Sequence, residues 1–153
     1  HIVRFYRTNG KIQSISGCQL SFDPQLEKHL LMNFSSIKEA FFSRCVIVVE
    51  GRTELGAMLV WKDTYLEDAD DQGISIIGAD SCSSVRPIVK LLEELCIPNV
   101  SVMDADDSNR SKYSDINKIF FKINRDFEED IYEETFANKP NCEFFFSLID
   151  FVD

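Results

Sequence analysis

Residues 45–54 have the sequence CVIVVEGRTE, which is the strongest indication of the fold in this chain. The apolar run at residues 46–49 is typical of a buried strand, and a helical pattern begins within a few residues of its end. The stretch therefore predicts a strand that feeds a helix through a tight turn, with Glu50 at the carboxyl end of the strand. In open α/β sheets, ligands bind in the crevice outside those ends. We expect Glu50 to lie at a ligand-binding edge.

A second stretch of the same kind, NVSVMDAD, occupies residues 99–106. Its apolar strand is followed by Asp104 and Asp106, and residues two apart on an extended chain face the same way. Two carboxylates on one side can ligate a hard cation such as Mg²⁺. A solvated turn is the alternative for these acids, because DADDSN is also good loop sequence.

The rest of the chain alternates strands with helices. Further strands are predicted at residues 74–77 and 119–123, and helices at residues 53–66, 85–95 and 126–136. Asn9-Gly10 between two β-like runs predicts a short N-terminal β-hairpin. The alternation indicates an α/β fold, with a Rossmann-like parallel sheet of about four strands and helices on both faces. Right-handed crossovers then place Glu50 and Asp104 at the same edge of the sheet.

Composition limits the class of protein. At 153 residues, 44% hydrophobic and 27% charged, the chain can bury one core. No apolar run approaches the roughly 18–20 residues of a membrane span, so no membrane association is expected. The five cysteines are scattered without a CxxC pair, which speaks against a zinc ribbon, and their odd number favours the reducing cytoplasm.

The net charge of −10 bears on the partners of the protein. Such a chain repels phosphate unless bound cations invert the local field. The acidity fits a metal-dependent enzyme that gains its DNA affinity from elsewhere, and it fits equally a charge that only aids solubility. The chain has neither a GxGxxG fingerprint nor a P-loop, so no nucleotide site is indicated.

Two further acids have both a functional and a structural explanation. Glu54 stands four residues after Glu50, and both can point into one crevice, but acids also favour helix N-termini by about 0.3–1 kcal/mol. Glu128 follows a predicted strand, as the other acids do, but it lies in an acidic helix for which a solvated face is the simpler explanation. For Glu50 the structural explanation is weaker, because a charge at the end of a buried strand needs a partner or a metal.

Read together, four motifs resemble a Toprim domain: VVEGRTE at residues 48–54, IIGAD at 76–80, VMDAD at 102–106 and DFEED at 126–130. In that family a Glu ends the first strand and a D-x-D motif ends the third. The VEGxTE form with a later DFE is similar to the OLD (overcoming lysogenization defect) family of nucleases, which includes the nuclease subunit of Gabija-type anti-phage systems. The resemblance covers about residues 37–136.

The resemblance implies a metal-dependent DNA endonuclease, with anti-phage defence as a further expectation. It implies an ATPase domain upstream in the same chain, so that residues 1–36 would be its tail, residues 37–137 the Toprim nuclease domain and residues 138–153 a partial C-terminal segment. DNA and that ATPase domain are the expected partners, and a homo-oligomer is compatible with the sequence. Carried over position by position, the metal-binding acids are Glu50, Glu54, Asp104, Asp106 and Glu128.

The chemistry expected is phosphodiester hydrolysis with two Mg²⁺ or Mn²⁺ ions, roughly 3.5–4 Å apart. Glu50, Asp104 and Asp106 would be the catalytic acids and hold one ion, while Glu54 and Glu128 would help to hold the second. Glu50 as a general base is an alternative.

Two departures from the family pattern stand out. GADSCSS replaces a glycine-rich turn after the second strand, which leaves Asp80 and Ser81 as site or loop residues. The downstream lysine of the family has only Lys139 near its place.

Three other functions compete with the nuclease. A primase- or topoisomerase-type Toprim domain is the nearest, although no tyrosine of the chain has the setting that a topoisomerase needs. A receiver-like phosphorylation switch would want a lysine at a late strand end, whereas Lys122 lies inside its predicted strand. The third is a non-catalytic acidic module that binds metal or a partner.

Overall fold

The computed structural model describes residues 3–20, 37–65 and 70–104, with short stretches and single residues at 24, 27–28, 34–35, 112–113, 119–121 and 127. The chain divides into two compact units, the first of residues 1–103 and 117–120 and the second of residues 104–116 and 121–153. The helix predicted at residues 126–136 lies outside the described residues, apart from Phe127.

The N-terminal hairpin forms as predicted. Strands β1 (Val3–Thr8) and β2 (Lys11–Ser16) pair in antiparallel register, with Thr8 opposite Lys11. The two-residue loop between them is Asn9-Gly10, and both residues have positive φ, 52° and 76°. Asn and Gly tolerate this left-handed backbone, which matches the twist of the flanking strands and fixes the register.

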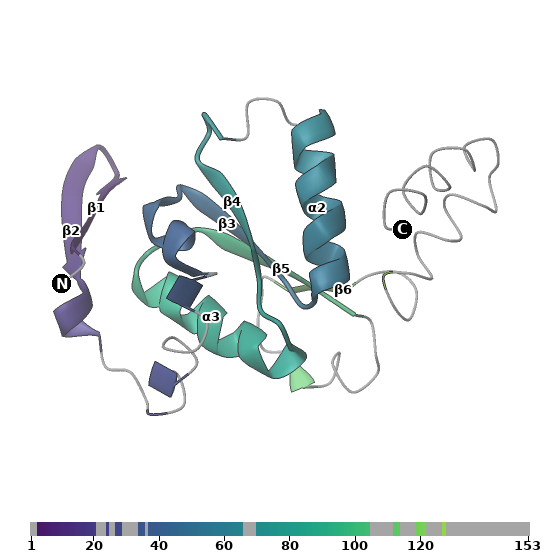
Figure 1. Cartoon of the computed structure of the whole chain (residues 1–153). Coiled ribbons are helices and arrows are strands. Elements are labelled where there is room, and N and C mark those ends of the chain that lie inside the picture. The colour runs from purple at the N-terminus through teal and green to yellow at the C-terminus, as the bar shows by residue number, and fades with distance from the viewer. Residues whose placement is uncertain are drawn as a thin grey trace. The chain divides into compact units, whose positions relative to one another are not determined.

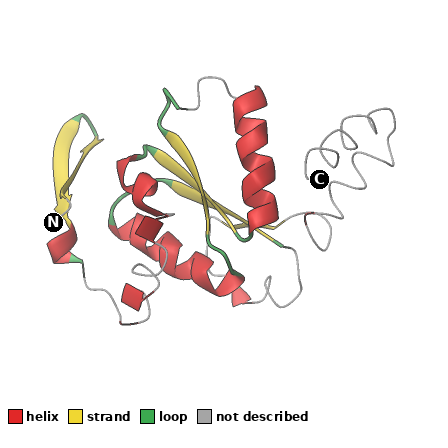
Figure 2. Ribbon diagram, in the orientation of Figure 1, coloured by secondary structure: helices red, strands yellow, loops and turns green. Residues whose placement is uncertain are grey.

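The main sheet contains three parallel strands, namely β3 (Cys45–Val49), β4 (Ile74–Gly78) and β5 (Asn99–Met103). The strand order is β4-β3-β5-β6, with the short β6 (Ile119–Phe121) beside β5. Figure 2 shows these strands between the helices. The α/β class and the parallel sheet are therefore confirmed, and the predicted strand at residues 119–123 is present in shorter form.

Two α-helices cover the sheet, α2 (Arg52–Tyr65) and α3 (Cys82–Glu94). The chain moves from β3 outward to β4 and then back past β3 to β5. Because crossovers between parallel strands are right-handed, this reversal puts the two helices on opposite faces, as Figure 1 shows. The prediction of helices on both faces is confirmed.

Helix α3 supplies most of the helical part of the core. Three of its apolar residues and the apolar residue at its C-cap are all at most 3% exposed: Ile88, Leu91, Leu92 and Leu95. The helix begins at Cys82, three residues before the predicted Val85, because the extended Ser81 is its N-cap. Pro87 therefore lies beyond the first turn of the helix. At this interior position it removes one backbone hydrogen bond.

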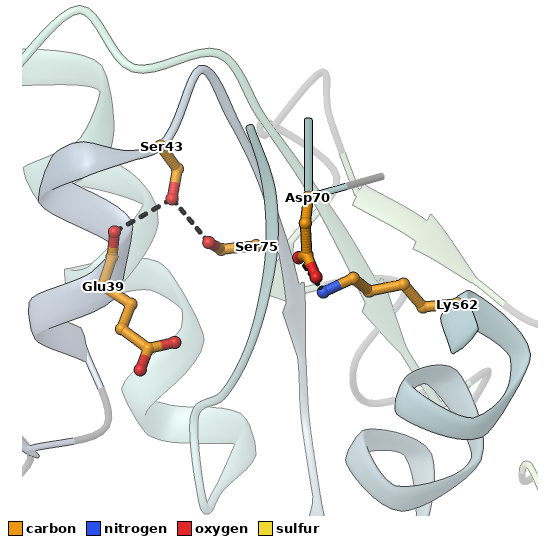
Figure 3. A network of polar contacts seen from close by, with 5 residues as sticks. All are labelled: Glu39, Ser43, Lys62, Asp70 and Ser75. Atoms are coloured by element: carbon orange, nitrogen blue, oxygen red, sulfur yellow. Dashed lines mark hydrogen bonds and ion pairs between the residues drawn. The ribbon is translucent and has the colours of Figure 1, made fainter. Parts of the chain in front are cut away.

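Helix α2 is less buried than its apolar pattern suggests. Leu55 and Met58 are half-buried, but Leu59 and Trp61 are 41% and 39% exposed. Lys62, whose side chain is mostly buried, pairs with Asp70 in the loop that follows the helix. The ion pair ties the last turns of α2 to the approach of β4, as Figure 3 shows.

A polar contact joins the 3-10 helix η2 (Lys38–Phe42) to the sheet. The Ser43 hydroxyl donates to the carbonyl oxygen of Glu39 at 2.9 Å and lies 2.6 Å from the hydroxyl of Ser75 in β4 (Figure 3). Since Ser43 is buried, these partners replace the water that its hydroxyl loses. This contact fixes the chain just before β3 begins.

Other features agree with the composition. In the described part of the chain, Cys18, Cys45, Cys82 and Cys96 do not form disulfide bonds. A side-chain hydrogen bond with Cys96 raises the pKa of the Tyr6 phenol above its usual value. Among the described residues, no helix is long and apolar enough to cross a membrane.

Candidate functional site

The three parallel strands end level with one another. Val49, the last residue of β3, pairs with Gly78 of β4 on one side and with Val102 of β5 on the other. The backbone N–H of Ala79 also donates to the carbonyl of Val49 at 2.8 Å, so the ladder reaches the ends of the strands. We call residues 50–54 and 79–81, which follow β3 and β4, the carboxyl edge.

The turn between β3 and α2 brings Glu50 and Glu54 onto the same short stretch of this edge. Only Glu50 and Gly51 separate the strand from the helix. Glu54 lies in the first turn of α2 and is 5% exposed, while Glu50 is half-buried. A carboxylate so nearly buried is uncommon in proteins and requires compensating interactions.

Gly51 makes room for the Glu54 carboxylate. A Cβ atom at position 51 would lie 2.7 Å from Oε2 of Glu54, a distance that real Cβ contacts essentially never show. The carboxylate therefore packs directly against the backbone of the turn. A larger residue at position 51 would therefore require the end of the Glu54 side chain to shift from this place.

An ion pair spans the carboxyl edge from β4 to β3. Nε of Arg52 lies 3.3 Å from Oδ1 of Asp80, and the two side chains are 89% and 42% exposed. Asp80 directly follows Ala79 at the end of β4 and has a left-handed backbone, with φ of 59°. The sequence does not predict this pair, because the two residues are 28 positions apart. The one available signal is a cation in the first turn of a helix, where an anion is favoured.

Of the three other predicted acids, only Asp104 lies among the described residues. Asp104 is half-buried and directly follows β5, as predicted, but it begins the second compact unit. Asp106 and Glu128 lie outside the described residues. Within the described part of the chain, no three His, Cys, Asp or Glu side chains form a group that could hold a metal ion. The five-acid metal site stays a prediction.

The carboxyl edge nonetheless suits a divalent cation. Glu50 and Glu54 offer carboxylate oxygens, the donors that Mg²⁺ and Mn²⁺ prefer. Gly51 leaves the Glu54 carboxylate the space that a side chain at position 51 would occupy. These two residues would offer ligands to such an ion from the turn after β3.

Comparison with known families supports this reading. Residues 41–106 match the family described as "Overcoming lysogenization defect protein-like, TOPRIM domain". A search of curated proteins finds no match. The matched residues contain β3 to β5, both α-helices and four of the five predicted acids, all except Glu128. Residues 41–106 of the chain are therefore an OLD-like Toprim domain, which is a domain of the metal-binding, nuclease type.

Proposed function

We propose that this domain is the catalytic part of a metal-dependent DNA endonuclease of the OLD type, which cleaves phosphodiester bonds with two Mg²⁺ or Mn²⁺ ions. The observation that carries the proposal is the fixed Glu54 carboxylate, packed on Gly51 at the edge where β3 and β4 end. A ligand held in one orientation by packing needs no rearrangement when it binds a metal. The match to the OLD-like Toprim family supports the proposal.

Each acid has a distinct role in the proposal. Glu50 and Glu54 bind from the turn after β3, and Asp104 and Asp106 bind from the residues after β5, with Glu128 added from further along the chain. When bound, the ions would supply the positive charge that stabilises the charge developing on the phosphate. The protein side chains orient this site and exclude competing ligands. Glu50 stays the candidate if a side chain accepts a proton from the attacking water.

The setting of the domain is also part of the proposal. The resemblance implies an ATPase domain upstream in the same polypeptide, DNA as the substrate and a role in anti-phage defence. The odd number of cysteines supports a cytoplasmic location.

Cleavage of supercoiled plasmid DNA tests the proposal. We expect the protein to nick or linearise the plasmid in Mg²⁺ or Mn²⁺, with ATP present or absent, and to be inactive in EDTA. The metal requirement follows from the carboxylate donor set, since acids alone repel the phosphate. Stoichiometric Mn²⁺ binding without any cleavage would instead favour the non-catalytic metal-binding module. A protein that neither binds Mn²⁺ nor cleaves DNA would contradict the metal site.

A further inference from the structure

We propose that Arg52 binds a phosphate of the DNA backbone beside the acidic site, and that Asp80 is the positioning residue that holds its guanidinium there. This inference rests on the proposed function, because it names a substrate contact of the same site. It assigns a role to two residues that lie between and beside the predicted metal ligands.

The first observation is the charge of the carboxyl edge. Residues 50–54 and 79–81 contain three acids, Glu50, Glu54 and Asp80, and a single cation, Arg52. A DNA strand that approaches this edge therefore meets like charge everywhere except at Arg52. The whole chain, at a net charge of −10, adds to the repulsion. An arginine can offset it locally and bind phosphate oxygens with its planar fork of donors.

The second observation is the geometry of the ion pair. Asp80 engages Arg52 through Nε, at 3.3 Å, which is one of several N–H donors of the guanidinium. The Arg52 side chain is 89% exposed, so its terminal amino groups face water while Nε is held. The contact thus restricts the direction of the guanidinium and leaves donors for a phosphate. An ion pair this exposed adds little to stability, so folding alone gives a weak reason for it.

The third observation is the position of Arg52. Arg52 is the first residue of α2, where the helix dipole disfavours a cation. Asp80, with a φ of 59°, has a left-handed backbone in which Asp is enriched, so its conformation alone does not indicate a function. An unfavourably placed cation that is held by an exposed contact points to a function for that contact.

Binding of a fluorescein-labelled DNA duplex, followed by anisotropy in Ca²⁺ at several salt concentrations, tests the inference. We expect Arg52→Ala to weaken binding about tenfold and to lower the slope of log K against log salt by about one, because one phosphate contact is lost. Arg52→Lys should keep the slope and recover part of the affinity, since it retains the charge without the fork. Lys90→Ala removes the same charge from the exposed surface of α3 and should bind like the wild-type protein.

Asp80→Gly separates positioning from structural support. Glycine relieves the left-handed backbone, so the variant should be at least as thermally stable as the wild-type protein. It should nevertheless bind DNA more weakly, and in the cleavage assay its KM should rise while kcat changes little. A residue that only supported the fold would show the opposite pattern, with lower stability and unchanged affinity.

The outcomes distinguish this inference from the proposed function. If Arg52→Ala binds DNA with wild-type affinity and salt slope while the wild-type protein cleaves, Arg52 is not a phosphate ligand and only the inference fails. If the wild-type protein binds DNA, Arg52→Ala weakens binding and no metal supports cleavage, the contact stands and the endonuclease fails. A wild-type protein that neither binds nor cleaves DNA overturns both the inference about Arg52 and the proposed endonuclease.

Discussion

Glu50→Gln and Asp104→Asn should each lower the rate of Mn²⁺-dependent DNA cleavage by at least about 100-fold. Each substitution keeps the shape of the side chain and removes one negative charge from the proposed metal site. A loss of about 3 kcal/mol of transition-state stabilisation, which is ordinary for a disturbed catalytic metal, gives this factor. The measurement is the initial rate of plasmid nicking, with thermal denaturation of each variant to show that it is folded.

Glu94→Gln is the matched control for both variants. Glu94 is an exposed acid at the last residue of α3, and its substitution changes the net charge by the same amount. It should cleave at the wild-type rate. If Glu50→Gln and Asp104→Asn also cleave at that rate, these acids do not carry the chemistry.

The second large effect is expected for Gly51→Ala. The new methyl group would lie 2.7 Å from Oε2 of Glu54, so the carboxylate must move out of its place. Because displacing an oriented ligand weakens metal sites by one or two orders of magnitude, we expect Mn²⁺ affinity to fall about 10–100-fold. Isothermal titration with Mn²⁺ measures the change directly, and cleavage should decline with it.

Gly56→Ala provides the internal comparison, since it makes the same chemical change five residues along the chain. A Cβ atom at Gly56 meets nothing within 4 Å, and the position lies within α2. Here alanine should stabilise the helix by about 1 kcal/mol and leave Mn²⁺ binding unchanged. Equal Mn²⁺ affinity in Gly51→Ala and the wild-type protein would mean that the position of the Glu54 carboxylate against Gly51 has no part in metal binding.

Much of the fold is predictable from local patterns. The apolar run of β3 and the two-residue Asn9-Gly10 loop each specify their element through short-range effects, so the sheet and the hairpin follow directly from the sequence. The start of α3 is harder to predict, because Pro87 is typical of a first turn but lies inside the helix. The extended Ser81 sets that boundary, and its hydroxyl lies 2.8 Å from that of Ser84.

Part of the candidate site is likewise predictable from local sequence, and part is not. Glu50 and Glu54 share one turn, so their proximity follows from the strand-to-helix pattern, and Gly51 explains how the buried Glu54 fits. The Arg52–Asp80 pair depends instead on the pairing of β3 with β4 and on a left-handed backbone at Asp80, which no local pattern encodes.

The most direct test of the account is anomalous diffraction from a crystal of the protein grown with Mn²⁺. We expect manganese to be bound by carboxylate oxygens of Glu50 and Asp104 together, with Glu54 ligating the same ion or its neighbour. Manganese elsewhere on the surface, or Glu50 and Asp104 opening onto different faces of the molecule, would contradict it.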